Sequence, residues 1–141
     1  LDAGADGIFF ATVDWATCDV ATAEQYAEFG RPYDLQVLSA IAEAEFNVLH
    51  VCRKHNMLAS MLDYPVRAFN WAADETGNPG LADILAKSDR AVMGGVAVRT
   101  VSGGTLEQVT AEVAKALAET AGMGTSGNPP NGSWVPARAR R

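Results

Sequence analysis

The chain has few cysteines, no long hydrophobic run and no excess of basic residues. Its two cysteines, Cys18 and Cys52, are too few for a disulfide framework in 141 residues, so we expect a reducing, cytoplasmic setting. No apolar run approaches the ~20 residues that cross a bilayer, so we expect no signal peptide and no membrane partner. Acidic residues outnumber basic ones 17 to 11, and the net charge of −6 argues against a nucleic-acid partner.

Apolar runs alternate with amphipathic segments along the chain, whose length allows one domain with a core. The runs that predict buried strands span 7–13, 47–52, 66–71 and 91–96. The helical patterns, two of them opened by capping boxes at Thr22/Gln25 and Thr105/Gln108, span 22–29, 32–42, 57–62, 81–87 and 105–117. We expect residues 1–121 to form the folded part, and 122–141, rich in Gly and Pro, to be irregular apart from a short strand near 132–135.

Four strand and helix units in strict alternation predict an α/β protein with a parallel sheet and right-handed crossovers. An eight-unit barrel typically needs ~250 residues, so this chain is about half of one. An open four-stranded sheet is the self-contained alternative. No strand is followed by a glycine-rich phosphate loop, since Gly94-Gly95 falls inside the fourth predicted strand, and this disfavours nucleotide binding.

His50 and Cys52 lie two residues apart at the end of the second predicted strand. Positions i and i+2 of a strand point to the same face, so the imidazole and the thiol would lie side by side. Both are good zinc ligands, and the carboxyl end of a parallel strand is where α/β proteins bind their ligands. The alternative is a small buried cysteine that packs beside a hydrogen-bonded histidine.

Other candidate residues follow the same ends of neighbouring strands. Asp14 follows the first strand. It is a candidate catalytic group or an additional metal ligand, and the alternative is an aspartate that only caps the loop. Arg53 would meet substrate carboxylates or be solvated. Asn70 and Trp71 end the third strand, where Trp71 would form either the apolar wall of a substrate pocket or part of the core. These residues predict a small-molecule site at the carboxyl edge of the sheet.

An ordered set of short motifs carries a family resemblance. The motifs are Gly4-Ala5-Asp6-Gly7, residues 22–29, Arg31-Pro32-Tyr33, Leu49-His50-Val51-Cys52, residues 66–71, Met93-Gly94-Gly95 and residues 104–109. Together they resemble the C-terminal half of the uroporphyrinogen decarboxylase superfamily. The resemblance implies a TIM (β/α)₈ barrel of which this chain is the second half. It also implies porphyrinogen decarboxylation without a metal or cofactor. In that branch a serine that contacts substrate corresponds to Thr12, which makes Thr12 a candidate catalytic residue.

A second branch of the superfamily contains zinc-dependent methyltransferases that act with corrinoid proteins and thiols. His50 and Cys52 resemble the His-x-Cys zinc pair of that branch. Its third ligand is a cysteine in a Gly-Cys-x-x-Pro element, and the similar run here, residues 132–136, has Ser133 in that place. A serine hydroxyl is a poor zinc ligand.

The third alternative is a truncated fragment without catalysis of its own. The sequence begins at Leu1, directly before a βα pattern, as if within a longer repeat. An isolated half-barrel exposes two strand edges, and exposed edges invite pairing. We therefore expect the chain to form a homo-oligomer or to pair with a missing N-terminal half.

Overall fold

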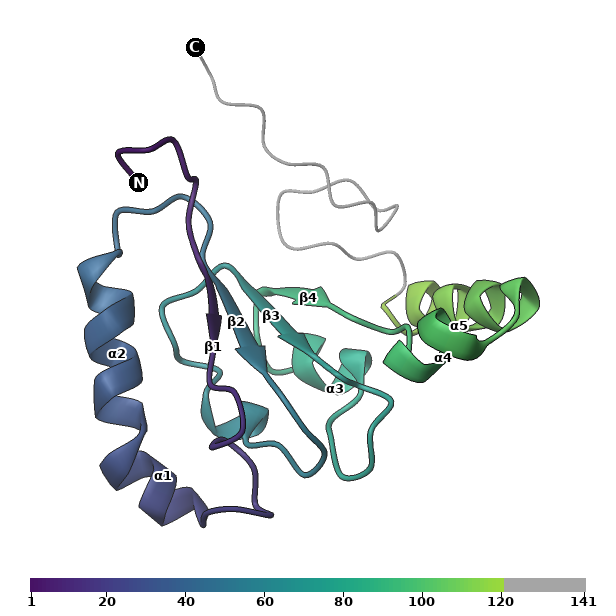
Figure 1. Ribbon diagram of the computed structural model, residues 1–141, viewed down its shortest axis with the longest axis horizontal. Coiled ribbons are helices and arrows are strands. Elements are labelled where there is room, and N and C mark those ends of the chain that lie inside the picture. Colours follow the sequence, from purple (N-terminus) through teal and green to yellow (C-terminus); the bar gives the residue numbers. More distant parts are fainter. Residues whose placement is uncertain (121–141) are drawn as a thin grey trace.

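The computed structural model describes residues 1–120, which form a four-stranded sheet with helices packed against it (Figure 1). The strands are β1 Phe9–Ala11, β2 Val48–Val51, β3 Ala68–Trp71 and β4 Ala91–Met93. The helices are α1 Ala23–Phe29, α2 Arg31–Ala40, the short 3₁₀ turn η1 Leu58–Ser60, α3 Leu81–Leu85, α4 Val98–Gly103 and α5 Leu106–Glu119. All strand pairs are parallel and the strand order is β1-β2-β3-β4. The predicted α/β class with a parallel sheet is confirmed.

One face of the sheet carries the hydrophobic core. Leu49 and Val51 of β2 and Phe69 of β3 have no exposed surface, and Trp71 is 2% exposed. They pack against apolar residues of the helices and loops, which are Tyr26, Leu38, Leu58, Met61, Tyr64, Leu81 and Ile84. This face therefore supplies most of the hydrophobic stabilisation of the domain.

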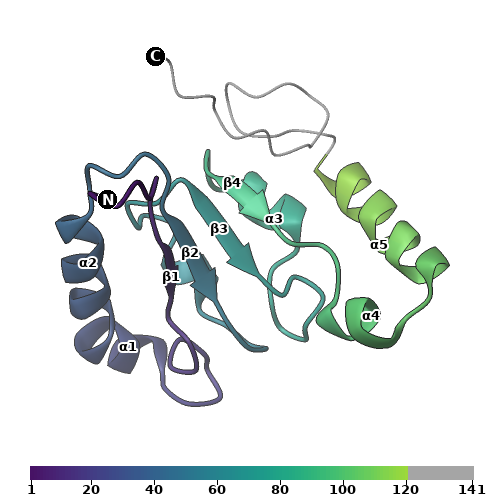
Figure 2. The ribbon, with the colours of Figure 1, turned by 45° about the horizontal axis from the view of Figure 1, so that its top comes forward.

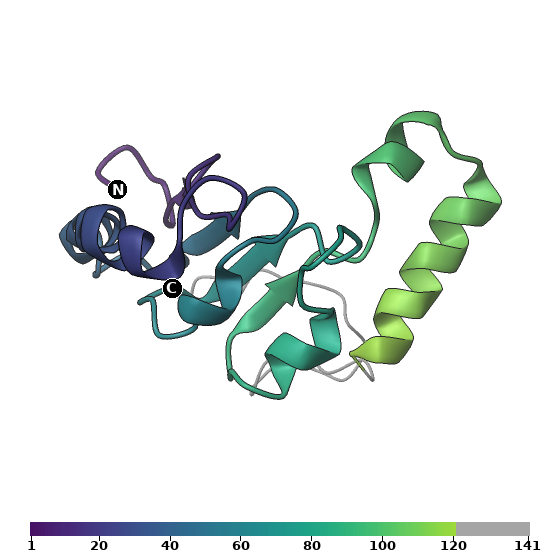
Figure 3. The ribbon, with the colours of Figure 1, turned by 90° about the horizontal axis from the view of Figure 1, so that it is seen from below.

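The other face, which we call the open face, is defined by Phe9, Ala11, His50, Asn70 and Met93. The strand register places these side chains on one face, and all five are half-buried or exposed, whereas Val48 and Ala68 at the amino ends of the same face are buried. Seen from below in Figure 3, α1 and α2 lie at one end of the sheet, and α4 and α5 lie at the opposite end. The helices are therefore gathered at the two ends of the sheet, with α3 packed beside β4.

Local signals in the sequence predicted the starts of α1, α2 and α5 to within a residue. Thr22 and Thr105 each accept a hydrogen bond from the backbone three residues on, and the Gln25 and Gln108 side chains reach back to complete both capping boxes. Pro32 lies in the first turn of α2, where its missing N–H is tolerated. These interactions involve neighbouring residues only, so they can be recognised without the fold.

The structure corrects the fourth predicted strand. It ends at Met93, and Gly94 and Gly95 follow it instead of lying within it. Gly95 has a φ of +100°, and a side chain there would meet Ala116 of α5 at 2.4 Å. The close approach of α5 therefore ends the strand.

Two helical segments also differ from the prediction. The expected helix over 57–62 is the single turn η1, and α4, which follows β4 directly, was not expected. Residues 121–141 lie outside the part of the chain that the structure describes. They include Ser133 and the strand predicted near 132–135. In the described part, no helix is long and apolar enough to span a membrane.

Candidate functional site

His50 lies in the middle of the open face, held by Asn70. The Nδ1 atom of His50 lies 2.5 Å from the Oδ1 atom of Asn70, whose Nδ2 donates to the Met93 carbonyl at 2.9 Å. Because Asn70 donates through its nitrogen, its oxygen accepts, and His50 Nδ1 carries the proton. In the neutral form of the ring, Nε2 is then the acceptor nitrogen. The Phe9 ring stacks on the imidazole, with 5.2 Å between centroids.

Asp14 and Arg53 form an ion pair at the carboxyl edge, beside Cys52. Arg53 Nε donates to Asp14 Oδ1 at 2.6 Å, and both side chains are more than half exposed. This hydrogen bond holds the pKa of Asp14 below its usual value. Burial first, and the negative charge of Asp14 second, raise the pKa of the Cys52 thiol. Cys52 is therefore a protonated, half-buried thiol at neutral pH, next to a charged pair.

The backbone is strained at this edge. Val13, Arg53 and His55 have φ angles of +49°, +70° and +48°, in the region that favours glycine. Each such residue costs on the order of 1–3 kcal/mol, and such strain gathers at functional sites. All three lie in the loops that follow β1 and β2, so the strain lies beside Asp14 and Cys52.

Hydrogen bonds tie these two loops to the loop that follows β3. Asn78 Nδ2 donates to the carbonyls of Arg53 and Ala72, at 2.8 Å each, and its Oδ1 accepts from the Asn56 amide at 2.9 Å. Thr17 of the first loop donates to the Lys54 carbonyl at 2.8 Å. The strained conformation is thus held by neighbouring loops.

Four predicted site residues lie on the face of His50 or near it, since Asn70 contacts His50, Cys52 follows it at i+2, and Arg53 with Asp14 lies next to Cys52. Thr12 and Trp71 do not share it. Thr12 is 5% exposed, alternates with the open-face residue Ala11, and lies near the Tyr26 hydroxyl.

Trp71 is packed in the core, and its Nε1 donates to the Pro79 carbonyl at 2.8 Å. Of the two predicted roles for Trp71, the structure therefore supports a place in the core and not a pocket wall beside His50. The odd and even positions of each strand decide this separation.

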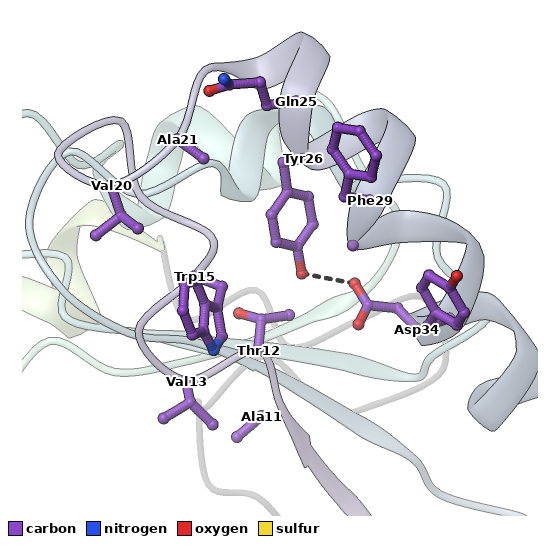
Figure 4. Close-up of a pocket in the computed structure, with 12 residues that line it drawn as sticks. Ala11, Thr12, Val13, Trp15, Val20, Ala21, Gln25, Tyr26, Phe29 and Asp34 are labelled. Carbon is purple, nitrogen blue, oxygen red and sulfur yellow. Dashed lines mark hydrogen bonds between the residues drawn. The ribbon is translucent and has the colours of Figure 1, made fainter.

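A groove of about 590 Å³ runs along the outer side of β1 and over α1 and α2. We call it the β1 groove, and Figure 4 shows Tyr26 and Asp34 directed toward Thr12 on its floor, with Trp15 beside them. Asp34 Oδ2 accepts from Tyr26 at 2.6 Å and from Tyr64 at 2.8 Å. Sequence analysis missed this cluster because Asp34 alone is an ordinary acidic residue in the first turn of a helix.

The zinc hypothesis does not find a complete set of donors here. Within residues 1–120, no group of three or more His, Cys, Asp and Glu side chains is placed to hold a metal ion. Zinc in proteins takes three or four protein ligands. His50 and Cys52 supply two, so the described residues do not fit a zinc site by themselves.

Comparisons of the chain with family models, with curated proteins and with solved structures find no match. The fold and the open face define an α/β protein with a parallel sheet and polar side chains gathered at its carboxyl edge.

Proposed function

We propose that this chain is half of a (β/α)₈ barrel of the uroporphyrinogen decarboxylase superfamily, and that its carboxyl edge binds a carboxylate-bearing tetrapyrrole. The open face supports this proposal. In a closed barrel one face of the sheet packs on the helices and the other faces the interior, and ligands bind at the carboxyl ends of the strands. The placement of His50, Asn70, Arg53 and Asp14 follows that plan.

Decarboxylation of a pyrrole acetate group breaks a carbon–carbon bond, releases CO₂ and requires a proton at the remaining carbon. A cation that holds carboxylates and a group that transfers a proton are therefore needed. Arg53 is a cation at this edge, and an imidazole that Asn70 holds through Nδ1 is suited to proton transfer through Nε2. We assign these two roles to Arg53 and His50, with Asn70 orienting the imidazole.

Uroporphyrin III, the oxidised octacarboxylate, is a fluorescent probe of this proposal. We expect the chain to bind it saturably, and Arg53→Gln to weaken binding about tenfold through loss of one charge-assisted contact. Arg67→Gln is the matched control, because Arg67 is an exposed arginine directly before β3, at the amino ends of the strands and away from the proposed site. Porphyrin fluorescence titration at constant ionic strength measures all three proteins.

Two results contradict the tetrapyrrole proposal. One is the absence of saturable binding at any porphyrin concentration tested. The other is equal weakening by Arg53→Gln and Arg67→Gln, which would reflect net charge alone. Weakening by Arg53→Gln only would place the ligand at the carboxyl edge.

Zinc-dependent methyl transfer is the second candidate, and the His-x-Cys spacing of His50 and Cys52 favours it. It requires stoichiometric zinc that protects Cys52 from alkylation until a chelator is added. Our main proposal predicts the opposite result: no stoichiometric zinc, and alkylation of Cys52 that is slow with or without chelator.

The slow alkylation follows from the raised pKa of Cys52, because only the thiolate reacts. Burial is the larger cause of this raised pKa and the charge of Asp14 the smaller one, so Asp14→Asn should speed alkylation of Cys52 modestly at pH 8 and leave exposed Cys18 unchanged. Mass spectrometry of the two peptides over time, with metal analysis of the purified chain, separates the two candidates.

A further inference from the structure

The β1 side of the molecule exposes an apolar surface next to a strand edge. Within residues 1–120 only β2 pairs with β1, so the outer edge of β1 has no partner strand. Beside it lie Trp15, Phe29 and Tyr33, which are 68%, 67% and 66% exposed. Phe29, Tyr33 and Val37 recur every four residues and form one stripe along α1 and α2. We call this surface, which includes the β1 groove, the head.

The opposite side of the sheet has the same character. Within the described residues β4 pairs only with β3. The last helix, α5, has no buried residue, and its apolar stripe exposes Leu106, Val113 and Leu117. Figure 2 shows α4 and α5 at the end of the sheet farthest from α1 and α2. We call this surface the tail.

These surfaces are large enough to form a stable interface. An aromatic side chain buries 150–250 Å², so the three exposed aromatic residues of the head present roughly 400 Å². The largest apolar patch of an ordinary monomer is about 300–600 Å² in total. Two head-to-tail contacts would cover two such heads, roughly 800 Å², and the exposed Leu106, Val113 and Leu117 of two tails add to this, toward the 1,200–2,000 Å² of a standard stable interface.

We propose that a second copy of this chain docks head to tail on the first, so that two copies close one ring of eight parallel strands. This inference rests on the proposed half-barrel. All four strands run in the same direction, so the β4 edge of one copy can continue into the β1 edge of the other with parallel pairing. A two-fold axis along the barrel repeats the contact and leaves no free edge.

Closure would also complete the site. The open faces of the two copies would enclose a common interior, with His50 and Asn70 of each copy lining it. The β1 groove would receive the tail helix α5 of the other copy, since α5 is the amphipathic helix whose apolar stripe is exposed. Substrate binding would then be a property of the dimer.

Analytical ultracentrifugation of the full chain, without porphyrin, tests the dimer. We expect the unmodified chain to be dimeric, and Tyr33→Glu in the head or Leu117→Glu in the tail each to raise the dimer dissociation constant by roughly 100-fold. Tyr33 is 66% exposed and Leu117 is 45% exposed, and neither belongs to the buried core, so the variants should keep the circular dichroism spectrum of the parent. Lys87→Glu, at an exposed position after α3, is the control and should leave the dimer intact.

Mixing the two variants distinguishes head-to-tail from other arrangements. A heterodimer of Tyr33→Glu with Leu117→Glu retains one contact free of either substitution, so the mixture should dimerise more tightly than either variant alone. A head-to-head dimer would instead be insensitive to Leu117→Glu. If the parent chain stays monomeric at 100-fold the concentrations used for porphyrin titration, the dimer proposal is wrong. The head and the tail would then be expected to bind a different half-barrel. Since no porphyrin is present, that result leaves the tetrapyrrole proposal to its own test.

Discussion

Replacing Asp34 with alanine is expected to lower the free energy of unfolding by about 3 kcal/mol, because two tyrosine hydroxyls lose their shared acceptor. Tyr64 is fully buried and Tyr26 is 7% exposed, so water does not readily replace the carboxylate. Urea unfolding followed by circular dichroism measures the change. Gln36→Ala, at an exposed position of the same helix, should change stability by less than about 0.5 kcal/mol.

The hydrogen bonds to Asp34 can be separated from its charge. Asp34→Asn keeps an acceptor oxygen and should cost less than Asp34→Ala, whereas equal losses would show that the charge alone matters. Burial first, and the bond to Asp34 second, raise the pKa of both tyrosines far above the ordinary value near 10.

This raised pKa also sets a pH dependence. Below about pH 10, Tyr26 and Tyr64 are protonated in both the folded and the unfolded chain, and their hydrogen bonds stabilise the fold in full. Above that pH the tyrosines of the unfolded chain ionise first, so the free energy of unfolding falls as the pH rises. The Tyr64→Phe variant should lose stability less steeply above pH 10 than the parent chain, when both are unfolded in urea at a series of pH values.

We expect Asn78→Ala to lower the free energy of unfolding by about 2–3 kcal/mol, since each of its three hydrogen bonds contributes about 1 kcal/mol. Those bonds join the loops that follow β2 and β3 and hold the carbonyl of Arg53, whose φ is strained. The substitution should therefore also weaken porphyrin binding. Thermal unfolding and the fluorescence titration together measure both effects.

Thr76→Ala is the matched control for Asn78. It lies in the same loop and takes part in the hydrogen bonding through its backbone carbonyl, which accepts from the His55 amide and is kept in the variant. We expect it to leave stability and porphyrin binding unchanged. If Asn78→Ala lowered stability but not binding, the loops would be shown to be structural supports without influence on the site.

Much of the fold could be predicted because its signals are local. The capping boxes at Thr22 and Thr105, and the strand that carries His50, depend on residues within a few positions of one another. The apolar stripe of α5 was also visible in the sequence. Its exposure was not, because burial depends on what packs against the helix and not on its own periodicity.

The candidate site was predicted in part for a related reason. The two-residue period of a strand predicts that His50 and Cys52 share one side, and in the structure β2 ends at Val51, one residue before Cys52. Thr12 and His50 lie on opposite faces because of the register between β1 and β2, which depends on hydrogen bonds between residues 38 positions apart. Tyr26 and Tyr64 meet at Asp34 only because two helical segments pack together.

The sequence alone determined the class of fold and the positions where α1 and α5 begin. These follow from backbone periodicity and from contacts within one turn. Only the tertiary structure decided which neighbour His50 meets, where Trp71 and Thr12 are directed, and which apolar surfaces remain uncovered. The reason is that register, crossover packing and burial join residues far apart in the chain, and no local pattern encodes the distance between them.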